Sequence, residues 1–565
     1  MIKKRLSILK KKFNSHGIDG YVIPKNDEFF SEYSLNDRLK TISNFSGSAG
    51  YAVILKKKNY LFVDGRYSLQ ARIESGNNFI IKKLSEILNC KLFKNITLGI
   101  DPKIFTENEI KKFFLKYNKI KMINFNLIDK IYNNYSKKNK QFYSLKEEIA
   151  GENHFNKIRK ISNILKKEKV DFLFVSAPEN VAWLLNIRGH DNPHSPMPHC
   201  HLLLNKNKEI FLISEKEKAI KLIKEKKILK NQVISPQEII TLFNKIKKSK
   251  FMIDHKTCSI FYQDSLIKKH KIIIKDDPIY AFKAIKNKVE IKNIINAHID
   301  DGVALTKFLY WIKMENKKKL TEVDAQKKLE KFRKKNKRYL FPSFNTIAGA
   351  GKNGAIIHYR ATKKNTKKID KRDIFLCDSG GQYQYGTTDV TRTICFSEPS
   401  SSIKNIFTNV LKGHIAVVTS NLKTHYNGKL IDKRARLNLK KSGLDYEHGT
   451  GHGVGFFSNV HEGPQAISKF NKIRLQEGMI LSNEPGYYKK GKFGIRIENL
   501  LYVSKNKKEL FFKNLTLAPI DRNLINFKIL NKEEKNYLFN YHLNIYLTLS
   551  KFLRKKEKKW LASFI

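Results

Sequence analysis

The sequence predicts a chain of several α/β domains. At 565 residues it is too long for one hydrophobic core, which favours two to four domains. Hydrophobic residues make up 41% of the chain, a share typical of globular proteins. In the first half, short apolar segments alternate with helical patterns, as expected for strands interleaved with helices. These observations divide the chain into three sections.

The first section covers about residues 1–150. It opens with a helical pattern and continues with the apolar segment Gly20–Pro24. Strand-like stretches follow at 51–55 and 60–67, and Asp64-Gly65 in the second of them is a turn signal. We therefore predict an α/β domain in this section.

The second section, about residues 151–288, repeats this order of elements. We predict helices at 153–168 and 178–186 and strands at 171–177, 201–205 and 209–214. Both sections begin with a lysine-rich helix followed by an apolar strand. This parallel hints at two related domains, although the sequence match is too loose to establish a duplication.

The third section, residues 289–565, has a different texture. Apolar residues at helical spacing predict a long helix at 291–315. A second helix is predicted at 321–335, because Thr321 lies three residues before Asp324, a helix-start signal. From residue 344 the sequence changes to short strands and glycine-rich turns, and the last 45 residues return to a helical pattern.

The formal net charge of +58 suggests at first sight a nucleic acid or an anionic membrane as partner. The lysines, however, are spread along nearly the whole chain in short solvated runs, without the aromatic residues of a nucleic-acid platform. We therefore attribute the charge to a composition bias at exposed positions. We predict no specific nucleic-acid partner and no membrane partner.

Cysteines and apolar segments bear on the cellular compartment. No apolar run approaches the roughly 18 residues that span a bilayer. The basic N-terminus lacks the apolar core and the small-residue cleavage site of a signal peptide. The cysteines are odd in number, scattered and without a C-x-x-C pair, which favours reduced thiols; they are Cys90, Cys200, Cys258, Cys377 and Cys395. We expect a cytoplasmic protein.

Five residues of the third section stand in contexts typical of a metal site. Asp378 closes an apolar strand, and Asp389 follows 11 residues later on a second strand, so a hairpin can bring both carboxylates together. His452 lies in the glycine-rich stretch HGTGHGVG, where small residues let backbone and metal approach closely. Glu484 follows the apolar segment GMILSN, and Glu498 lies in GIRIEN.

The stretch GIRIEN alternates with a period of two. Arg496 and Glu498 therefore share one face of a strand, while Ile495 and Ile497 point to the other.

Four carboxylates with one imidazole form a hard, oxygen-rich ligand set. Such a set suits a pair of Mn²⁺ ions, with Co²⁺ or Zn²⁺ as substitutes, better than a thiolate zinc site does. Two divalent ions about 3.5–4 Å apart can hold and deprotonate a water and stabilise the resulting oxyanion. Each acid alone is more often a solvated carboxylate, a turn residue or a cap. The prediction rests on all five occurring in strand-end or glycine-rich contexts of so basic a chain.

Six sequence blocks carry a resemblance to a known family: GKNGAIIHY (351–359), CDSGGQYQYGTTDVTRT (377–393), HGTGHGVG (448–455), VHEGP (460–464), SNEPGYY (482–488) and GIRIEN (494–499). In these blocks the chain resembles aminopeptidase P (Xaa-Pro aminopeptidase), one of the pita-bread metallopeptidases. FSGSAGYAVI with VDGRY, and ENVAWLLNIRG, resemble the two creatinase-type N-terminal domains of its long, three-domain form. NLTLAPID with NYHLNIY resembles its C-terminal extension.

The resemblance implies a fold and an activity. The expected fold class is α/β (α+β), with creatinase-type domains at 1–150 and 151–288. A pita-bread catalytic domain at 289–565 follows, its extension beginning at about 510. The expected activity is hydrolysis of the N-terminal Xaa-Pro bond of peptides whose second residue is proline, through a hydroxide activated by two metal ions per subunit. Because members of this form are commonly homodimers, the resemblance also implies a homodimer.

The resemblance also implies residue roles. It makes Asp378, Asp389, His452, Glu484 and Glu498 the metal ligands, with Asp389 and Glu498 bridging. His358, His448 and His461 match histidines that bind substrate and handle protons. Glu484 is expected to relay a proton of the attacking water, and Arg496 matches a residue that supports the metal-bridging network.

Three other histidines, His194, His199 and His201, lie in NPHSPMPHCH. Their spacing matches no zinc pattern on which we rely. We predict that they are loop residues bordering the substrate entrance.

Other functions remain open. A prolidase would cut Xaa-Pro dipeptides with the same metal set, but the length of the chain, HGTGHGVG and VHEGP favour the aminopeptidase. A methionine aminopeptidase is less favoured, because nearly 290 residues precede the catalytic section. A pita-bread protein without metals would be a binding module, and the complete set of ligands and histidines argues against it. Only the charge favours a nucleic-acid-binding protein.

Overall fold

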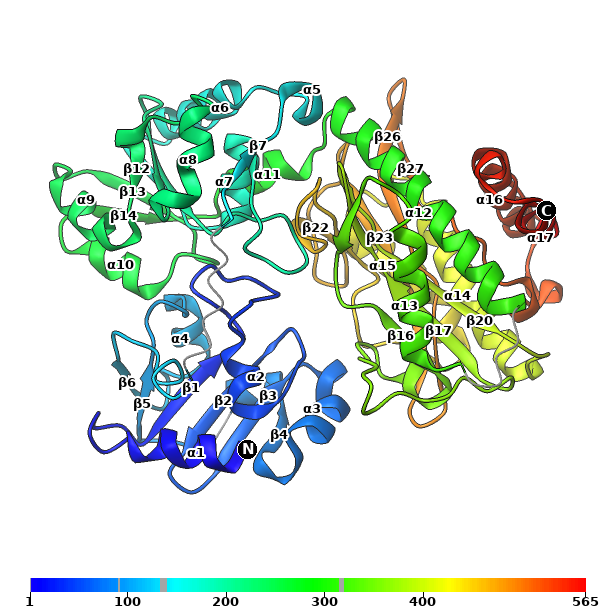
Figure 1. Ribbon diagram of the computed structural model, residues 1–565, viewed down its shortest axis with the longest axis horizontal. Helices are drawn as coiled ribbons and strands as arrows, with labels where there is room; N and C mark the ends of the chain where they lie inside the picture. The colour runs from blue at the N-terminus through cyan, green and yellow to red at the C-terminus, as the bar shows by residue number, and fades with distance from the viewer. Residues whose placement is uncertain (1, 90–91, 133–139, 315–319) are drawn as a thin grey trace. The chain divides into compact units, whose positions relative to one another are not determined.

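The computed structural model describes residues 2–89, 92–132, 140–314 and 320–565. The chain divides into two compact units, residues 1–280 (unit 1) and 281–565 (unit 2). Figure 1 shows the elements of each unit. Cys90 and the last residue of the helix predicted at 291–315 lie outside the described residues.

The first part of unit 1 is a six-stranded sheet of order β4-β3-β2-β1-β5-β6. Its strands are β1 (Gly20–Pro24), β2 (Gly50–Leu55), β3 (Asn59–Val63), β4 (Ile80–Lys83), β5 (Thr97–Ile100) and β6 (Lys119–Met122). Its helices are α1 (Ile2–Lys11), α2 (Arg38–Ser43), α3 (Ser68–Ser75) and α4 (Glu107–Phe113). The strands predicted at 20–24 and 51–55 are confirmed. The stretch predicted at 60–67 is a strand only to Val63, after which Asp64 leads into a 3₁₀ helix, Gly65–Tyr67.

The second part of unit 1 is another six-stranded sheet, of order β12-β11-β10-β8-β13-β14. Its strands are β8 (Phe172–Val175), β10 (His201–Asn205), β11 (Ile210–Ile213), β12 (Val233–Ile234), β13 (Lys250–Ile253) and β14 (Lys271–Ile274). The helices are α5 (Glu147–Ala150), α6 (His154–Lys167), α7 (Pro178–Leu185), α8 (Lys216–Lys224), α9 (Ile239–Lys245) and α10 (Ile260–Ile267), and β7 (Tyr143–Ser144) pairs with β9 (Ile187–Arg188). All five elements predicted for 151–288 are present within one or two residues.

The two sheets of unit 1 have the same topology. In each, the central strand (β1 or β8) pairs antiparallel with the next strand on one side (β2 or β10) and parallel with the strand on the other (β5 or β13). The outer pairs also match in direction: β3 with β4 and β11 with β12 are parallel, as are β5 with β6 and β13 with β14. The hint of two related domains is therefore confirmed at the level of strand order and direction.

Unit 2 surrounds its sheets with helices, as Figure 1 shows for α12–α15. The helices are α12 (Lys288–Met314), α13 (Glu322–Arg333), α14 (Ser401–Val418), α15 (Gly428–Lys441), α16 (Lys532–Leu549) and α17 (Lys555–Ala562), and α11 (Ile279–Ala284) leads in from unit 1. Three strands form one sheet: β16 (Ile347–Ala350), β17 (Ile374–Ser379) and β20 (Val390–Cys395). Five form another: β21 (Gly451–Gly453), β22 (Glu462–Ile467), β23 (Ile480–Asn483), β26 (Asn499–Asn506) and β27 (Glu509–Asn514). Smaller pairings join β15 (Tyr339–Pro342), β18 (Gly381–Tyr383) and β19 (Gly386–Thr387), and β24 (Gly486–Lys489) with β25 (Phe493–Arg496).

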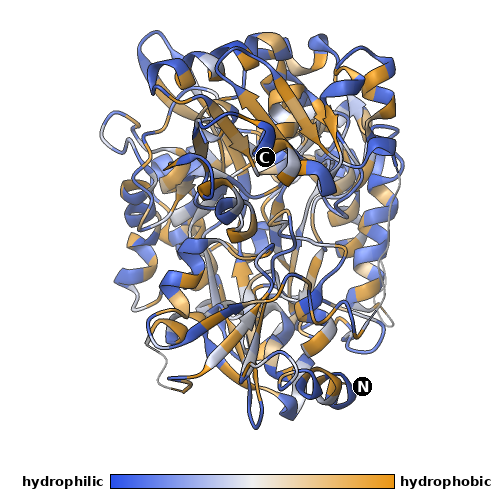
Figure 2. Ribbon diagram, turned by 90° about the vertical axis from the view of Figure 1, so that its left-hand side faces the viewer, coloured by the Kyte–Doolittle hydropathy of each residue, from blue (hydrophilic) through white to orange (hydrophobic). Residues whose placement is uncertain are grey.

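Local sequence explains where these helices begin. The Thr321 hydroxyl accepts from the Asp324 amide while the Asp324 carboxylate accepts from the Thr321 amide, so the predicted capping box forms. In α14 a stripe of buried residues that includes Phe407 and Leu411 faces the core of unit 2. Figure 2 shows this mixture of hydrophobic and hydrophilic residues along the helices.

A buried ion pair joins the first two helices of unit 2 to the segment that follows β17. Arg333 on α13 donates to both carboxylate oxygens of Asp301 on α12, at 2.8 and 3.2 Å, and to the Gly380 carbonyl at 3.2 Å. Asp301 also accepts from the hydroxyls of Tyr383 and Thr388, at 2.8 and 2.9 Å. Both charged side chains are at most 3% exposed. The pair therefore fixes residues 380–388 from the helix side.

We expect Asp301→Ala to lower the free energy of unfolding by about 3–5 kcal/mol, because it leaves the Arg333 guanidinium buried without its counter-charge. The measurement is the urea-unfolding transition of the full chain. Asp370→Ala is the matched control: Asp370 pairs with Arg372, but the two side chains are 50% and 90% exposed. This control should leave the transition unchanged. Equal midpoints for the two variants would contradict the importance of the buried pair.

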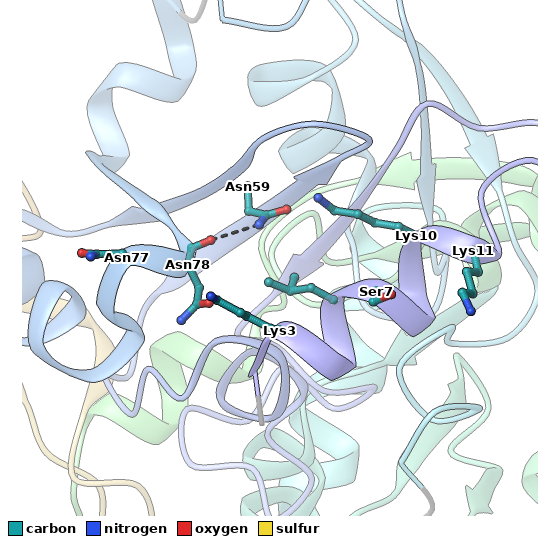
Figure 3. A pocket seen from close by; sticks show the side chains of 8 residues that line it. Lys3, Ser7, Lys10, Lys11, Asn59, Asn77 and Asn78 are labelled. Carbon is teal, nitrogen blue, oxygen red and sulfur yellow. Dashed lines mark hydrogen bonds between the residues drawn. The ribbon is translucent and has the colours of Figure 1, made fainter.

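The surface of unit 1 carries a lysine-lined groove of about 610 Å³. Figure 3 shows Lys3, Lys10 and Lys11 on α1 and the asparagines on the opposite side, where Asn59 donates to the carbonyl of Asn78 at 3.0 Å. The groove is open and its lysines are at least partly exposed, so the lysine-rich composition of the chain accounts for it.

Within the described residues, no helix has both the length and the apolar character that crossing a membrane requires.

Candidate metal centre

The two aspartates of the predicted site lie on neighbouring strands. Asp378 is on β17 and pairs in register with Thr391 of β20, and Asp389 immediately precedes β20. The prediction that both carboxylates approach one site is consistent with this register. The connection is not a simple hairpin, however, because residues 381–387 contain β18 and β19, which pair with each other, and β18 also pairs with β15.

His452 lies on β21, between β22 and β23. The glycines on either side of it are required by close backbone approach. A Cβ atom on Gly451 would lie 1.9 Å from the Ser482 carbonyl oxygen, and one on Gly453 would lie 2.1 Å from that of Glu462. The glycines of HGTGHGVG therefore let the strand that carries the imidazole fit between its two neighbours.

The two glutamates lie just beyond strand ends. The amide of Glu484 donates to the Thr450 carbonyl at 2.8 Å, and the amide of Glu498 donates to the Thr391 carbonyl at 3.1 Å. The Thr391 hydroxyl also donates to the Glu498 carboxylate at 2.7 Å. Ile495 and Ile497 pack in the core of unit 2, whereas Arg496 bonds to Asp378 and Glu498 to Thr391, so the side chains differ in direction as predicted. The strand itself, β25, ends at Arg496.

These side chains converge at the junction of the two sheets. His452 Nε2 lies 3.5 Å from Asp389 Oδ2 and 3.5 Å from Glu484 Oε1. One ligand atom from each of Asp389, His452 and Glu498 lies within 4.8 Å of the others, so this group can hold a metal ion. The structure thus brings together four of the five predicted ligands by direct proximity.

Two further observations fit a cation at this place. His452 Nδ1 lies 2.9 Å from the Gly453 carbonyl oxygen, an arrangement that fixes the proton on Nδ1 and leaves Nε2 for a metal. The Oδ1 atom of Asp378 is buried and has no hydrogen-bond partner among the described residues. A buried carboxylate oxygen without a partner is costly unless a cation meets it.

Charge crowding shifts the protonation of this group. Burial, with the charges of Asp389, Glu484 and Asp378, raises the pKa of Glu498 well above its ordinary value. Burial also raises the pKa of Asp389 to about 6. Burial opposes the charged form of His452, but its hydrogen bond to Asp389 and the charge of Glu484 raise the pKa of the imidazole to about 9.

Asp378 connects to a chain of hydrogen bonds that ends at His448. Arg496 donates to Asp378 Oδ2 at 2.6 Å and to the Tyr488 hydroxyl at 2.7 Å. The same hydroxyl lies 2.9 Å from His448 Nε2, and His448 Nδ1 lies 2.8 Å from the Gly449 carbonyl oxygen. Tyr488 can therefore donate to a neutral His448 while it accepts from Arg496.

The other two predicted histidines lie on loops of unit 2. The His461 ring packs edge-on against His452 with centroids 4.3 Å apart. His358 is half-buried and follows a 3₁₀ helix, Gly351–Ala355. Its neighbour Tyr359 donates to buried Glu322 at 2.8 Å, and Glu322 also accepts from the Ala350 amide at 2.8 Å. These bonds fix the loop that carries His358.

The histidines of NPHSPMPHCH are in unit 1 and pack against aromatic residues. His199 stacks on Phe29 with centroids 4.4 Å apart, and His194 meets Tyr33 edge-on at 5.1 Å. The prediction of loop residues is wrong for His201, which opens β10 and is only 4% exposed, with Nδ1 2.9 Å from the Ser176 carbonyl oxygen. Every residue of the strand HLLLN is buried, so its first side chain is buried as well.

Sequence reasoning missed two residues of the site, Tyr488 and Thr391. Both lie inside the blocks SNEPGYY and TTDVTRT, so their positions were marked, but neither side chain is ionised at neutral pH or a common metal ligand. Their roles become visible only when the strands are paired.

Family profiles match nearly the whole chain. The profile of metallopeptidase family M24 matches residues 292–505, and that of its C-terminal region matches 508–563. Two profiles of the creatinase/prolidase N-terminal domain match residues 5–128 and 133–290.

Individual relatives agree with these profiles. The chain is 36% identical to the probable Xaa-Pro aminopeptidase P of Laccaria bicolor, over 99% of this chain and 92% of that one. The crystal structure of X-prolyl aminopeptidase from Caenorhabditis elegans, described as a cytosolic enzyme with a di-nuclear active site, matches with a TM-score of 0.91 and 29% identity. That match covers 100% of this chain and 99% of the other. A prolidase from Pyrococcus furiosus matches with a TM-score of 0.51 and 25% identity, over 63% of this chain and 98% of that one.

The fold and the site define a metal-dependent hydrolase: two creatinase-type domains followed by a pita-bread catalytic unit. The chain belongs to metallopeptidase family M24.

We expect metal binding to release protons. Metal ligands must lose their protons. The pKa of His452, raised to about 9, means that the metal-free protein holds a proton there at neutral pH, and the pKa of Glu498 is shifted in the same direction. The apparent affinity for Mn²⁺ should therefore rise with pH up to about 9, by about tenfold per pH unit for each proton released. Titration calorimetry at pH 7 in buffers of different ionisation enthalpy counts these protons. Binding without proton release would contradict the expectation.

Proposed function

We propose that this chain is an aminopeptidase that hydrolyses the N-terminal Xaa-Pro bond of peptides with the help of two divalent metal ions. The observation that carries the proposal is the convergence of Asp389, His452, Glu484 and Glu498 beside the unpartnered oxygen of Asp378. Similarity over the full length to Xaa-Pro aminopeptidases supports the substrate class.

The proposed ligands are Asp378, Asp389, His452, Glu484 and Glu498, with Asp389 and Glu498 bridging. Four carboxylates and one imidazole favour Mn²⁺, and Co²⁺ or Zn²⁺ could replace it. When bound, two such ions would supply Lewis-acid polarisation of the scissile carbonyl and would lower the pKa of water. The charges of Asp389, Glu484 and Asp378 that disfavour ionisation of Glu498 support a site built for cations.

The residues of the chain divide the remaining tasks. Glu484 lies at the edge of the site with 19% of its side chain exposed, and is proposed to relay a proton of the attacking water. His358, His448 and His461 are proposed to bind the substrate and move protons, since imidazole titrates near neutral pH. Arg496 holds Asp378 by a direct ion pair and reaches His448 through the Tyr488 hydroxyl.

The N-terminal amine and the proline of an Xaa-Pro peptide both suit such a site. A free N-terminal amine is a cation, and the acidic residues of the site give it a partner, which explains cleavage after the first residue. Proline in the second position forms a tertiary amide without an N–H donor, so the pocket must accept a ring rather than bond a donor.

A prolidase-type dipeptidase is the second candidate. The prolidase match covers a smaller part of this chain than the match to X-prolyl aminopeptidase does. The additional length favours the aminopeptidase.

We further propose the division into 1–150, 151–288 and 289–565, with the extension from about 510, a cytoplasmic location and a homodimer. The cysteines support the location: the four described ones are free and buried. The cytosolic relative supports it as well.

The test uses metal-stripped protein with and without added Mn²⁺. We expect Mn²⁺-dependent release of the first residue from an Xaa-Pro-Xaa tripeptide and little from an Xaa-Pro dipeptide or a tripeptide without proline. Asp389→Ala should lower kcat/KM by about 1000-fold or more, because it removes a bridging ligand. Asp370→Ala, an exposed carboxylate, should not. Preference for the dipeptide would identify a prolidase, and absence of both activity and bound metal would favour a binding module.

A second prediction concerns Tyr488. Tyr488→Phe removes only the hydroxyl between Arg496 and His448, so we expect kcat to fall about 10- to 100-fold. The metal content should stay unchanged, because Arg496 still pairs with Asp378. Tyr487→Phe is the matched control on the neighbouring residue. Loss of metal together with activity in Tyr488→Phe would show instead that the hydroxyl maintains the ligand set.

A further inference from the structure

The loop that connects β21 to β22 carries His461 and is held at its middle and at its end. Midway along it, the Ser458 carbonyl accepts from the side-chain amide of Gln382 at 2.8 Å and from the Thr387 hydroxyl at 3.3 Å. At its end lies Glu462, the residue after His461 and the first of β22. The position of His461 therefore depends on how Glu462 is held.

Glu462 is held by two buried lysines. Lys283 Nζ lies 3.1 Å from Glu462 Oε2, and Lys286 Nζ donates to Glu462 Oε1. The three side chains are at most 5% exposed. Burial works against the Glu462 carboxylate, but the two ammonium groups hold its pKa below the ordinary value. In a chain of 110 basic residues, most of them solvated, two lysines buried on one carboxylate are a specific arrangement.

The backbones on both sides of this contact are also fixed. Glu462 pairs with Gly453, the residue after His452. The Lys286 amide donates to the Gly478 carbonyl at 3.0 Å, and Ile285 forms a bridge with Met479, the residue before β23. The lysines thus belong to the segment by which the chain enters unit 2. The backbone of this segment bonds to the residues that lead into β23, a strand of the sheet that carries His452.

We propose that Glu462, held by Lys283 and Lys286, is a positioning residue that keeps His461 packed against His452. The proposal rests on the proposed function for the role of His461. It assigns the entry segment of unit 2, residues 283–286, a part in setting the active site. None of the three residues needs to touch the substrate.

The test compares lysine variants of the full chain with bound Mn²⁺. Lys286→Met leaves Glu462 a single partner, Lys283, and so keeps the buried pair neutral. Lys288→Met is the matched control, because Lys288 lies two residues further along, at the start of α12, and is exposed. We expect Lys286→Met to lower kcat/KM for an Xaa-Pro-Xaa tripeptide about tenfold at unchanged metal content, and Lys288→Met to have no effect.

A double-mutant cycle with His461→Ala separates positioning from general damage. If Lys286 acts through His461, adding Lys286→Met to His461→Ala should lower kcat/KM by less than about twofold more. The proposal would be overturned if the kcat/KM losses of the two single variants multiplied in the double variant, or if Lys286→Met kept full activity. If Lys286→Met fails to fold, Lys283→Met, which keeps the Lys286–Glu462 pair, takes its place under the same criteria.

A crystal structure of the variant provides a readout that does not depend on activity. The His461 ring should leave its edge-on contact with His452, which has centroids 4.3 Å apart in the native chain. A ring that stays in place overturns the proposal even if the chain has another substrate. A wild-type chain that is inactive on Xaa-Pro peptides while the ring moves would reject the proposed function and leave the positioning role standing.

Discussion

The burial of several carboxylates in one small space is the constraint on which unit 2 depends. Like charges at this distance cannot all ionise without cations nearby, and burial strengthens their repulsion. Arg496 and the imidazole of His452 compensate part of this negative charge. The negative charge that remains uncompensated raises the pKa of Glu498 and leaves one oxygen of Asp378 without a hydrogen-bond partner among the described residues. This uncompensated charge is the physical basis of metal binding.

Much of the surrounding fold serves to hold these side chains rigidly. The Asp301–Arg333 pair holds the segment between Asp378 and Asp389 in place. The glycines beside His452 let its strand pack closely between the two neighbouring strands. Glu322 gathers the loop before His358. The Asp301–Arg333 pair and Glu322 are buried polar groups with hydrogen-bond partners, and such groups set position more sharply than apolar packing does. A few residues can thus bind metal and substrate, and many others fix the positions of those few.

The sequence alone predicted the elements with strong local patterns. The period of α12, the capping box of α13 and the apolar strands β1, β2 and β8 depend on neighbouring residues and were found within a few positions. The five acidic and histidine residues stood out because ligands cluster in glycine-rich, strand-end contexts. The pairing of β18 with β15, the burial of His201 and the contact of Tyr488 with His448 were not predicted, since each depends on which distant segments meet. The lysines on Glu462 were hidden for a related reason, because two among so many basic residues carry no local signal.

The repeated topology of unit 1 creates a risk of wrong strand pairing, and the sequences of the outer strands reduce that risk. Two sheets of equal strand order within one chain can exchange strands or pair edge to edge while they fold, a common route to misassembly and aggregation. Three of the four outer strands carry lysine: β4 reads IIKK, β6 reads KIKM and β14 reads KIII. Charged residues on an open edge repel another edge of the same kind. Part of the lysine excess, which says little about what the protein binds, thus lies on sheet edges, where charge disfavours pairing between two similar domains.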